Sequence, residues 1–371
     1  MRYWAPFKHT LLFAVALFLA TPALAHPRDT GFLNRRIVFR GTTYKFQVYV
    51  PEQWSSSQRW PVILFLHGRG ERGSDGLDQT QVGLPAAIRA HPERWPFVVV
   101  MPQVPFNHHW WTDPDMMEMA MAALRAESGE FNGDPQRTYL TGLSMGGYGT
   151  WELAKTYRGV FAAIVPISGG VYWSYAPPQR WRDTSLPAEY ASRIGRTPVW
   201  MFHGTEDTVV SPKQSVLLYE ALKASGGCVR LWEYVGVKHS AWDKGYAEPE
   251  LPRWLLAHRL ADIAHTEPLA ERLLIPSQPT PARINPAIYD AYVGEYRDEN
   301  VVMVTIFRQG DSLFQKNGHG EVTELQPESP TTFFYPWGGS TRLCFEKDAT
   351  GQIRGLLYRD DRHEEHWTRA R

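Results

Sequence analysis

The chain has 371 residues, 43% of them hydrophobic and 21% charged, which is the composition of a folded globular protein and not of a disordered one. Its 39 basic and 39 acidic side chains balance, which argues against a nucleic-acid-binding or polybasic membrane-surface protein, since both carry a basic excess. Two cysteines are too few for a disulfide scaffold or a cysteine-rich zinc module. The length favours two domains, or one domain with an appendage.

Residues 1–25 predict a secretory signal peptide. Positive charges at Arg2 and Lys8 flank the start of a short apolar segment, and Ala23 and Ala25 then give the small-x-small pattern of a cleavage site. The apolar run is too short to span about 30 Å of hydrocarbon. We therefore expect cleavage after Ala25, a mature chain without a membrane span, and a periplasmic or secreted location.

Residues 26–264 alternate between strand-like and helix-like patterns. Two adjoining segments, 36–40 and 43–50, predict a hairpin, and continuous apolar runs that suit buried parallel strands follow it. The predicted strands are residues 61–66, 97–101, 138–141, 162–167, 198–202 and 229–235. The predicted helices are residues 115–127, 146–157, 213–224 and 251–264. This alternation predicts an α/β fold with a doubly wound, mostly parallel sheet, whose ligands bind beyond the carboxyl ends of the strands.

The pattern changes after residue 264. Residues 265–287 contain several prolines and predict a stiff linker. Residues 288–371 show short strands and turns without a helical stretch, which predicts a second, small all-β domain, either a barrel or a sandwich. Cys228 and Cys344 fall in different predicted domains, so we favour two free thiols over a disulfide bridge.

A glycine-rich motif marks the candidate nucleophile. Residues 142–146, GLSMG, match G-x-S-x-G and lie between a strand-like segment and a helix-like one. In that context the glycines permit a cramped strand-to-helix turn, which exposes Ser144. The alternative is a glycine-rich turn in which the serine only caps the helix. We predict that Ser144 is the nucleophile of a serine hydrolase.

A serine hydroxyl needs a base to accept its proton, and we assign that role to His239. His239 follows the last predicted strand of the α/β region, where a loop can reach the carboxyl edge of the sheet. His258 and His265 lie on or beside the last predicted helix and are more typical of surface residues.

A carboxylate must orient the imidazole of the base, and Asp207 is the candidate. It follows the predicted strand 198–202, and the chain order Ser144, Asp207, His239 is the order of the α/β-hydrolase triad. Glu206 is an alternative acid, whereas Asp243 comes too late in the chain.

Two backbone N–H groups are predicted to form the oxyanion hole. One belongs to Met145, directly after the nucleophile. We assign the other to Arg69, which stands between two glycines after an earlier strand. Because the contact is made by the backbone, the Arg69 side chain is free to steer acidic substrates or to pair with Glu71 or Asp75.

These segments resemble the secreted α/β-hydrolase esterases, a carboxylesterase and polyhydroxybutyrate-depolymerase-like group that is related to dienelactone hydrolases and often labelled predicted peptidases. The matching segments are residues 67–75, 102–103, 110–111, 142–147, 203–207 and 239–242. The resemblance implies ester hydrolysis through an acyl-enzyme without a metal or organic cofactor. It also implies that Trp110 and Trp111 lie at the active site as substrate-binding residues, with packing on the sheet as the alternative.

The C-terminal region is similar to a small β-barrel module that is appended to serine hydrolases of the penicillin-binding-protein-like class. The segments that carry this similarity are residues 292–296, 325–327, 333–334 and 345–348. The resemblance implies that the module can mediate assembly, so we expect a homo-oligomer formed through it.

We predict a serine carboxylesterase acting on a small-molecule or oligomeric ester, and the sequence does not choose among short acyl, feruloyl or acetyl sugar, and polyester substrates. The first alternative is a peptidase of the prolyl-oligopeptidase type, although the residues before the first core strand are too few for its propeller. The second is a non-catalytic binding or assembly protein on a hydrolase scaffold. His108 and His109 point to opposite faces of an extended chain and predict no metal site.

Overall fold

The computed structural model describes residues 29–108, 110–172, 183–275, 281–298, 301–336, 341–359 and 364–370. The predicted signal peptide and His109 lie outside these residues. None of the helices in the described part of the chain is long and apolar enough to cross a lipid bilayer.

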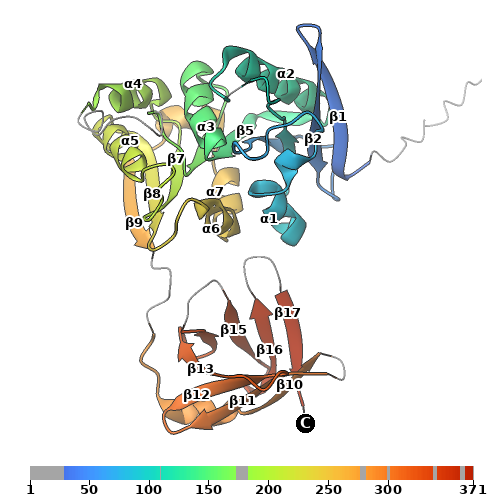
Figure 1. The fold of residues 1–371 in the computed structure, drawn as a ribbon, viewed down its shortest axis with the longest axis vertical. Coiled ribbons are helices and arrows are strands. Elements are labelled where there is room, and N and C mark those ends of the chain that lie inside the picture. The colour runs from blue at the N-terminus through green and yellow to red at the C-terminus, as the bar shows by residue number, and fades with distance from the viewer. Residues whose placement is uncertain are drawn as a thin grey trace, which may run out of the picture.

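The N-terminal part is built on a nine-stranded sheet with the order β1-β2-β4-β3-β5-β6-β7-β8-β9 (Figure 1). The first two strands form an antiparallel hairpin, β2 pairs antiparallel with β4, and all later neighbours are parallel. The strands are β1 (Gly31–Phe39), β2 (Thr42–Val50), β3 (Trp60–Leu66), β4 (Val98–Met101), β5 (Gly133–Leu143), β6 (Ala163–Ile167), β7 (Val199–Gly204), β8 (Cys228–Tyr234) and β9 (Leu269–Ile275). The predicted doubly wound α/β sheet is confirmed.

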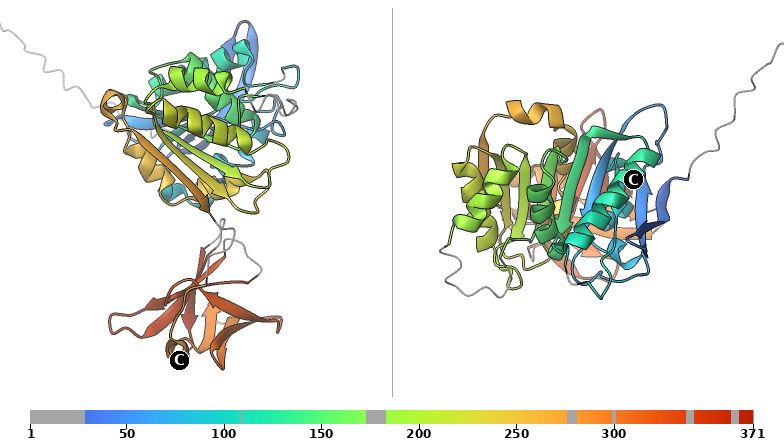
Figure 2. Two further views of the ribbon diagram at one scale, coloured as in Figure 1. Left: turned by 90° about the vertical axis from the view of Figure 1, so that its left-hand side faces the viewer. Right: turned by 90° about the horizontal axis from the view of Figure 1, so that it is seen from above.

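Helices cover both faces of this sheet, as Figures 1 and 2 show. One face carries α2 (Pro114–Glu130), α3 (Met145–Thr156), α4 (Ser185–Ile194) and α5 (Lys213–Ala224). The other carries α1 (Leu84–Ala90), α6 (Ala241–Ala247) and α7 (Leu251–Leu256). Because successive strand residues point to opposite faces, β3 serves both cores: Leu64 belongs to one and Phe65 to the other. This explains why its sequence is apolar throughout.

The predicted linker begins too early, because part of it is the last strand of the sheet. Residues Leu269–Ile275 form β9, which pairs in parallel with β8 along its whole length. The sequence hides this strand because an edge strand on the rim of the sheet is little buried, and Leu274 is 63% exposed. Residues 276–280 of the predicted linker lie outside the described residues.

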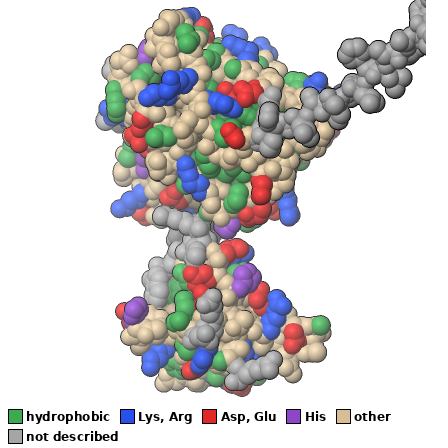
Figure 3. Space-filling view, turned by 90° about the vertical axis from the view of Figure 1, so that its right-hand side faces the viewer, with side chains coloured by type: hydrophobic (Ala, Val, Ile, Leu, Met, Phe, Trp, Pro, Cys, Tyr) green, Lys and Arg blue, Asp and Glu red, His purple; other side chains and the backbone are tan. Residues whose placement is uncertain are grey.

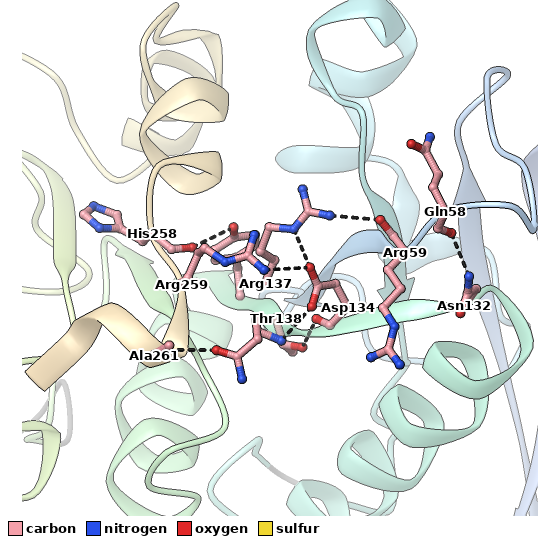
Figure 4. A network of polar contacts seen from close by, with 11 residues as sticks. Gln58, Arg59, Asn132, Asp134, Arg137, Thr138, His258, Arg259 and Ala261 are labelled. Carbon is pink, nitrogen blue, oxygen red and sulfur yellow. Dashed lines mark hydrogen bonds and ion pairs between the residues drawn. The ribbon is translucent and has the colours of Figure 1, made fainter.

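The helix predicted over residues 251–264 is also shorter than expected. It ends at Leu256, and a separate 3-10 helix, η4 (Leu260–His265), follows. Figure 4 shows the polar contacts that hold the intervening segment against the start of β5. Asp134 accepts hydrogen bonds from Arg137 at 2.7 Å and Arg259 at 3.4 Å, and the Ala261 N–H donates to Gln136 at 2.9 Å. These contacts draw the chain away from the helix axis.

The C-terminal strands close into an eight-stranded barrel, which settles the predicted choice between barrel and sandwich. Its strands are β10 (Gly294–Asp298), β11 (Val301–Gln309), β12 (Ser312–Asn317), β13 (Val322–Pro327), β14 (Thr332–Phe334), β15 (Arg342–Lys347), β16 (Ile353–Arg359) and β17 (Glu364–Arg369). A short 3-10 helix, η5 (Pro286–Ala291), precedes them, so the expectation of no helical stretch after residue 288 is wrong. It delivers Tyr289, whose side chain packs into the barrel core against Phe333.

Charged side chains of both signs are interspersed over the face shown in Figure 3. This distribution accords with the balanced charge of the sequence. Cys228 on β8 and Cys344 on β15 are both free thiols, as the sequence indicated.

Candidate active site

Ser144 occupies a tight turn between the end of β5 and the start of α3. Its backbone has φ 52° and ψ −115°, a region that non-glycine residues rarely occupy. A Cβ on Gly146 would lie 1.9 Å from the Leu66 carbonyl oxygen, and one on Gly142 would lie 2.4 Å from the Gly146 oxygen. Both glycines of the motif are therefore required by close backbone approach, and the turn raises Ser144 above the carboxyl edge of the sheet.

The structure brings the three predicted triad residues together. His239 Nε2 lies 2.8 Å from Ser144 Oγ, and His239 Nδ1 lies 2.7 Å from Asp207 Oδ2. The three residues follow β5, β7 and β8, so the carboxyl ends of three parallel strands position them. Each distance is a hydrogen bond, and the arrangement forms a continuous chain from carboxylate to hydroxyl.

Asp207 is held as an anion. Its side chain is fully buried, and its Oδ1 accepts the N–H groups of Val209 at 2.8 Å and Val210 at 2.9 Å. Burial alone would raise the pKa of this carboxyl, but hydrogen bonds from His203, His239 and Val210 hold the pKa well below its ordinary value. A charged carboxylate here can stabilise a positive imidazole on His239.

The alternative histidine His258 does not belong to this cluster. Its carbonyl oxygen accepts a hydrogen bond from the Tyr139 hydroxyl, and its ring packs against Trp254 at 4.7 Å. It lies within the polar network of Figure 4, beside the amino-terminal end of β5. Ser144 stands at the opposite end of that strand.

The loop after β3 is held in place by a buried histidine. His67 Nδ1 donates to the Gly68 oxygen at 2.5 Å, and its Nε2 accepts the Val104 N–H at 3.0 Å. Burial lowers the pKa of His67 to about 4, so the ring is neutral and keeps both bonds. A Cβ on Gly68 would meet Glu71 at 2.7 Å and Leu143 at 2.8 Å. This packing places Gly68 against Leu143, the residue that precedes the serine.

Both predicted oxyanion residues lie beside the serine. Met145 is the first residue of α3, and the first N–H groups of a helix have no partner within it. Arg69 lines the same hollow as Ser144, from the loop that follows β3.

The two predicted tryptophans have different surroundings. Trp110 lines the hollow around Ser144 and packs edge-on to Tyr148, with ring centroids 5.8 Å apart. Trp111 is fully buried, and its indole N–H donates to the His67 carbonyl oxygen at 2.9 Å. The prediction that Trp111 contacts substrate is therefore wrong, because this ring is part of the core and is bound to the loop that follows β3.

The hollow over the serine has a volume of about 520 Å³. Its apolar walls include Trp110, Tyr148, Val209 and Trp242, and the Trp242 ring lies 5.1 Å from the His239 ring. Volume and lining match a site for a small organic ligand.

Sequence reasoning missed Tyr148 and Trp242 as walls of this hollow. Tyr148 lies one helical turn after Ser144 and Trp242 lies three residues after His239. This short spacing from two triad residues is the sequence signal that could have placed both rings beside the serine.

The sequence predicts no metal site at His108 and His109. His109 lies outside the described residues. His108 instead hydrogen-bonds Asp113 at 2.9 Å. Across the described residues, no group of three or more His, Cys, Asp or Glu side chains is arranged to hold a metal ion.

Comparison with known proteins identifies the family of the chain. The family model named Esterase matches residues 39–241, which is more than half of the chain. Feruloyl esterase B of Thermothelomyces thermophilus is 28% identical over 203 residues, covering 46% of this chain and 67% of that protein. Poly(3-hydroxyalkanoate) depolymerase C of Paucimonas lemoignei is 35% identical over 95 residues, covering 21% of this chain and 23% of that protein.

A solved structure agrees with these matches. The crystal structure of a thermostable esterase superposes with a TM-score of 0.54 at 30% sequence identity. The match covers 62% of this chain and 63% of that chain.

Proposed function

The chain belongs to the Esterase family and is a carboxylic ester hydrolase, and from this premise we propose that it cleaves its ester through an acyl-enzyme on Ser144. The observation that carries the proposal is the hydrogen-bonded chain from Asp207 through His239 to Ser144, with distances of 2.7 and 2.8 Å. The serine ends this chain inside an apolar hollow, where a bound ester carbonyl would meet it.

The first half of the reaction acylates the serine. His239 Nε2 takes the hydroxyl proton as Ser144 Oγ attacks the ester carbonyl carbon. The N–H groups of Met145 and Arg69 donate to the oxyanion of the tetrahedral intermediate. His239 then gives the proton to the departing alcohol, while buried Asp207 stabilises the positive imidazole.

The second half repeats these steps with water as the nucleophile. His239 accepts a proton from water, which attacks the acyl carbon, and returns the proton to Ser144 Oγ as the carboxylic acid leaves. The products are one acid and one alcohol, and the serine is regenerated.

A serine-directed probe tests the acyl-enzyme directly. A fluorophosphonate should add one phosphonyl group to the protein, and peptide mass mapping should place that group on Ser144. Prior incubation with a slowly hydrolysed ester should block the labelling. Unlabelled Ser144 in a folded protein would contradict the proposal and would revive a non-catalytic role for the scaffold.

The walls of the hollow favour an ester with an aromatic or bulky apolar group. Trp110 and Tyr148 present ring surfaces beside Ser144, and flat rings bind such groups well. Similarity to a feruloyl esterase supports this choice. We expect Trp110→Ala to raise KM for methyl ferulate about tenfold while leaving p-nitrophenyl acetate nearly unaffected. Equal effects on both esters would place the ring outside substrate recognition.

The signal-like N-terminus supports an extracytoplasmic location, periplasmic or secreted. Edman sequencing of the protein recovered outside the cytoplasm should begin at His26. Recovery of the protein in the cytoplasm with residues 1–25 still attached would contradict this location.

A further inference from the structure

A second histidine contacts the carboxylate of the triad, and the proposed mechanism leaves it without a role. His203 lies in β7, and its side chain is completely buried. Its Nε2 lies 3.2 Å from Asp207 Oδ2 and 2.9 Å from the Val210 carbonyl oxygen. Its Nδ1 lies 2.7 Å from the Ser215 hydroxyl, which belongs to α5.

These neighbours fix where the proton of the ring lies. Both neighbours of Nε2 are acceptors, so Nε2 must carry a proton, and this single N–H is shared between the Val210 carbonyl oxygen at 2.9 Å and Asp207 Oδ2 at 3.2 Å. The Ser215 hydroxyl can then donate to Nδ1, because a hydroxyl rotates to suit its partner. Ser215 is itself buried, at 3% exposure, so water does not compete for this bond.

The result is a carboxylate with all its acceptor positions filled. Oδ1 of Asp207 accepts two backbone N–H groups, from Val209 and Val210. Oδ2 accepts His239 on one side and His203 on the other. An ionised carboxylate offers about four such positions. Without His203, one buried lone pair of Asp207 would lose its donor, and only His239 would still hold Oδ2.

We propose that His203 is a positioning residue of the reaction. Its hydrogen bond fixes the plane of the Asp207 carboxylate, and the negative charge of that carboxylate is shared between the rings of His203 and His239. Ser215 is the anchor that holds the His203 ring in the donating orientation. This inference rests on the proposed function of Ser144, His239 and Asp207, and it assigns the buried histidine a role in catalysis beyond packing.

Two substitutions separate this role from packing alone. His203→Gln keeps an amide N–H that can reach Asp207, whereas His203→Leu fills similar space without a donor. We expect His203→Leu to lower kcat for p-nitrophenyl acetate about 10–100-fold with KM within twofold, since it removes a hydrogen bond to a charged group. His203→Gln should recover most of kcat.

The pH profile gives a second readout that packing would not move. The titratable groups in this chain of contacts are Asp207 and, beyond it, His239. Loss of the His203 donor leaves more of the negative charge of Asp207 facing His239, which favours the protonated imidazole. The acidic limb of kcat/KM should therefore move to higher pH in His203→Leu, by about one unit.

The controls keep the outcomes distinct. His258→Leu changes another histidine far from the serine and should keep wild-type kcat. If His203→Leu does not fold, Ser215→Ala tests the same contact and should lower kcat severalfold with unchanged KM. Wild-type kcat and pH profile in His203→Leu or in Ser215→Ala, or equal losses in the Gln and Leu variants, would overturn the proposal. Activity remaining in Ser144→Ala would instead refute the proposed function itself.

Discussion

Residues around Ser144 act either through their side chains or through their backbone, and substitution affects the two groups differently. His239 and Asp207 supply side-chain atoms at hydrogen-bond distance. In the proposed mechanism Arg69 supplies only a backbone N–H. A change that preserves the backbone should therefore be tolerated even directly beside the nucleophile.

Substitutions in the loop after β3, which contains Gly68 and Arg69, test this difference. Gly68→Ala would place a Cβ 2.7 Å from the end of the Glu71 side chain and 2.8 Å from the end of the Leu143 side chain, so these two side chains must move to admit it. Because the backbone can stay in place, we expect kcat to fall by less than about 10²-fold, the cost of losing one oxyanion donor. Arg69→Ala keeps the N–H and should stay within about threefold of wild type. Steady-state kinetics on p-nitrophenyl acetate measures both, and a larger loss in Arg69→Ala would mean that its side chain contributes.

At this scale the sequence predicted the triad because Ser144, Asp207 and His239 each follow a recognisable strand, and strand ends converge in a parallel sheet. It failed for Trp111, since adjacent tryptophans look alike in sequence and only the packing decides which one is buried. It also could not predict that His203 turns toward Asp207, because a strand residue can face either side of the sheet.

A polar contact within apolar surroundings joins helix α2 to strand β1. Helix α2 carries Glu127, which is 5% exposed and faces Arg35 of β1 at 3.5 Å. Burial raises the pKa of Glu127 to about 7, and the attraction of Arg35 only partly opposes that rise.

The raised pKa of Glu127 makes the free energy of unfolding depend on pH. Its pKa in the folded chain is above the ordinary value of 4.5, so the folded state binds the extra proton between about pH 4.5 and 7. Stability is then greatest at the acidic end of this window and falls as pH rises through it. As pH rises through this window, the free energy of unfolding of the Glu127→Gln variant should fall by on the order of 2–3 kcal/mol less than that of the wild type. Urea unfolding at pH 5 and pH 8 checks this, and an unchanged difference would contradict it.

Asp134, at the start of β5, gives the opposite dependence of stability on pH, because its pKa is lowered and not raised. Burial opposes ionisation of Asp134, but hydrogen bonds from Arg137 and the Gln136 N–H, with the charge of Arg259, lower its pKa overall. Its stabilising effect is therefore present above about pH 4 and lost in acid. Asp134→Ala should cost about 1–3 kcal/mol at pH 7 with kcat unchanged. Thermal unfolding with parallel kinetics measures it, and a change in kcat would show coupling to the distant site.

Sequence patterns predicted the inner strands well because these are buried on both faces and therefore apolar throughout. They missed β9, where Leu269, Leu273 and Leu274 are 39%, 40% and 63% exposed and burial leaves no periodic signal. The early end of α7 was equally hidden, since it depends on Arg259 and Ala261 reaching residues more than a hundred positions away.

At the scale of the whole molecule, the triad lies entirely in the nine-stranded part, and the barrel has a separate core. We propose that the barrel serves assembly between copies of the chain. Truncation after Ile275 keeps β9 in the sheet, whereas truncation after Ala264 would remove it. The longer truncation product should keep kcat within about twofold and lose its oligomeric mass by light scattering. An unchanged mass would remove the assembly role.

The most direct measurement is the turnover of p-nitrophenyl acetate by the folded protein and by its Ser144→Ala variant. Removal of the hydroxyl leaves His239 and Asp207 in place, so the loss reports the nucleophile alone. We predict a fall in kcat of about 10⁴-fold or more, with circular dichroism and melting temperature unchanged. Equal rates in the two folded proteins would contradict hydrolysis through Ser144.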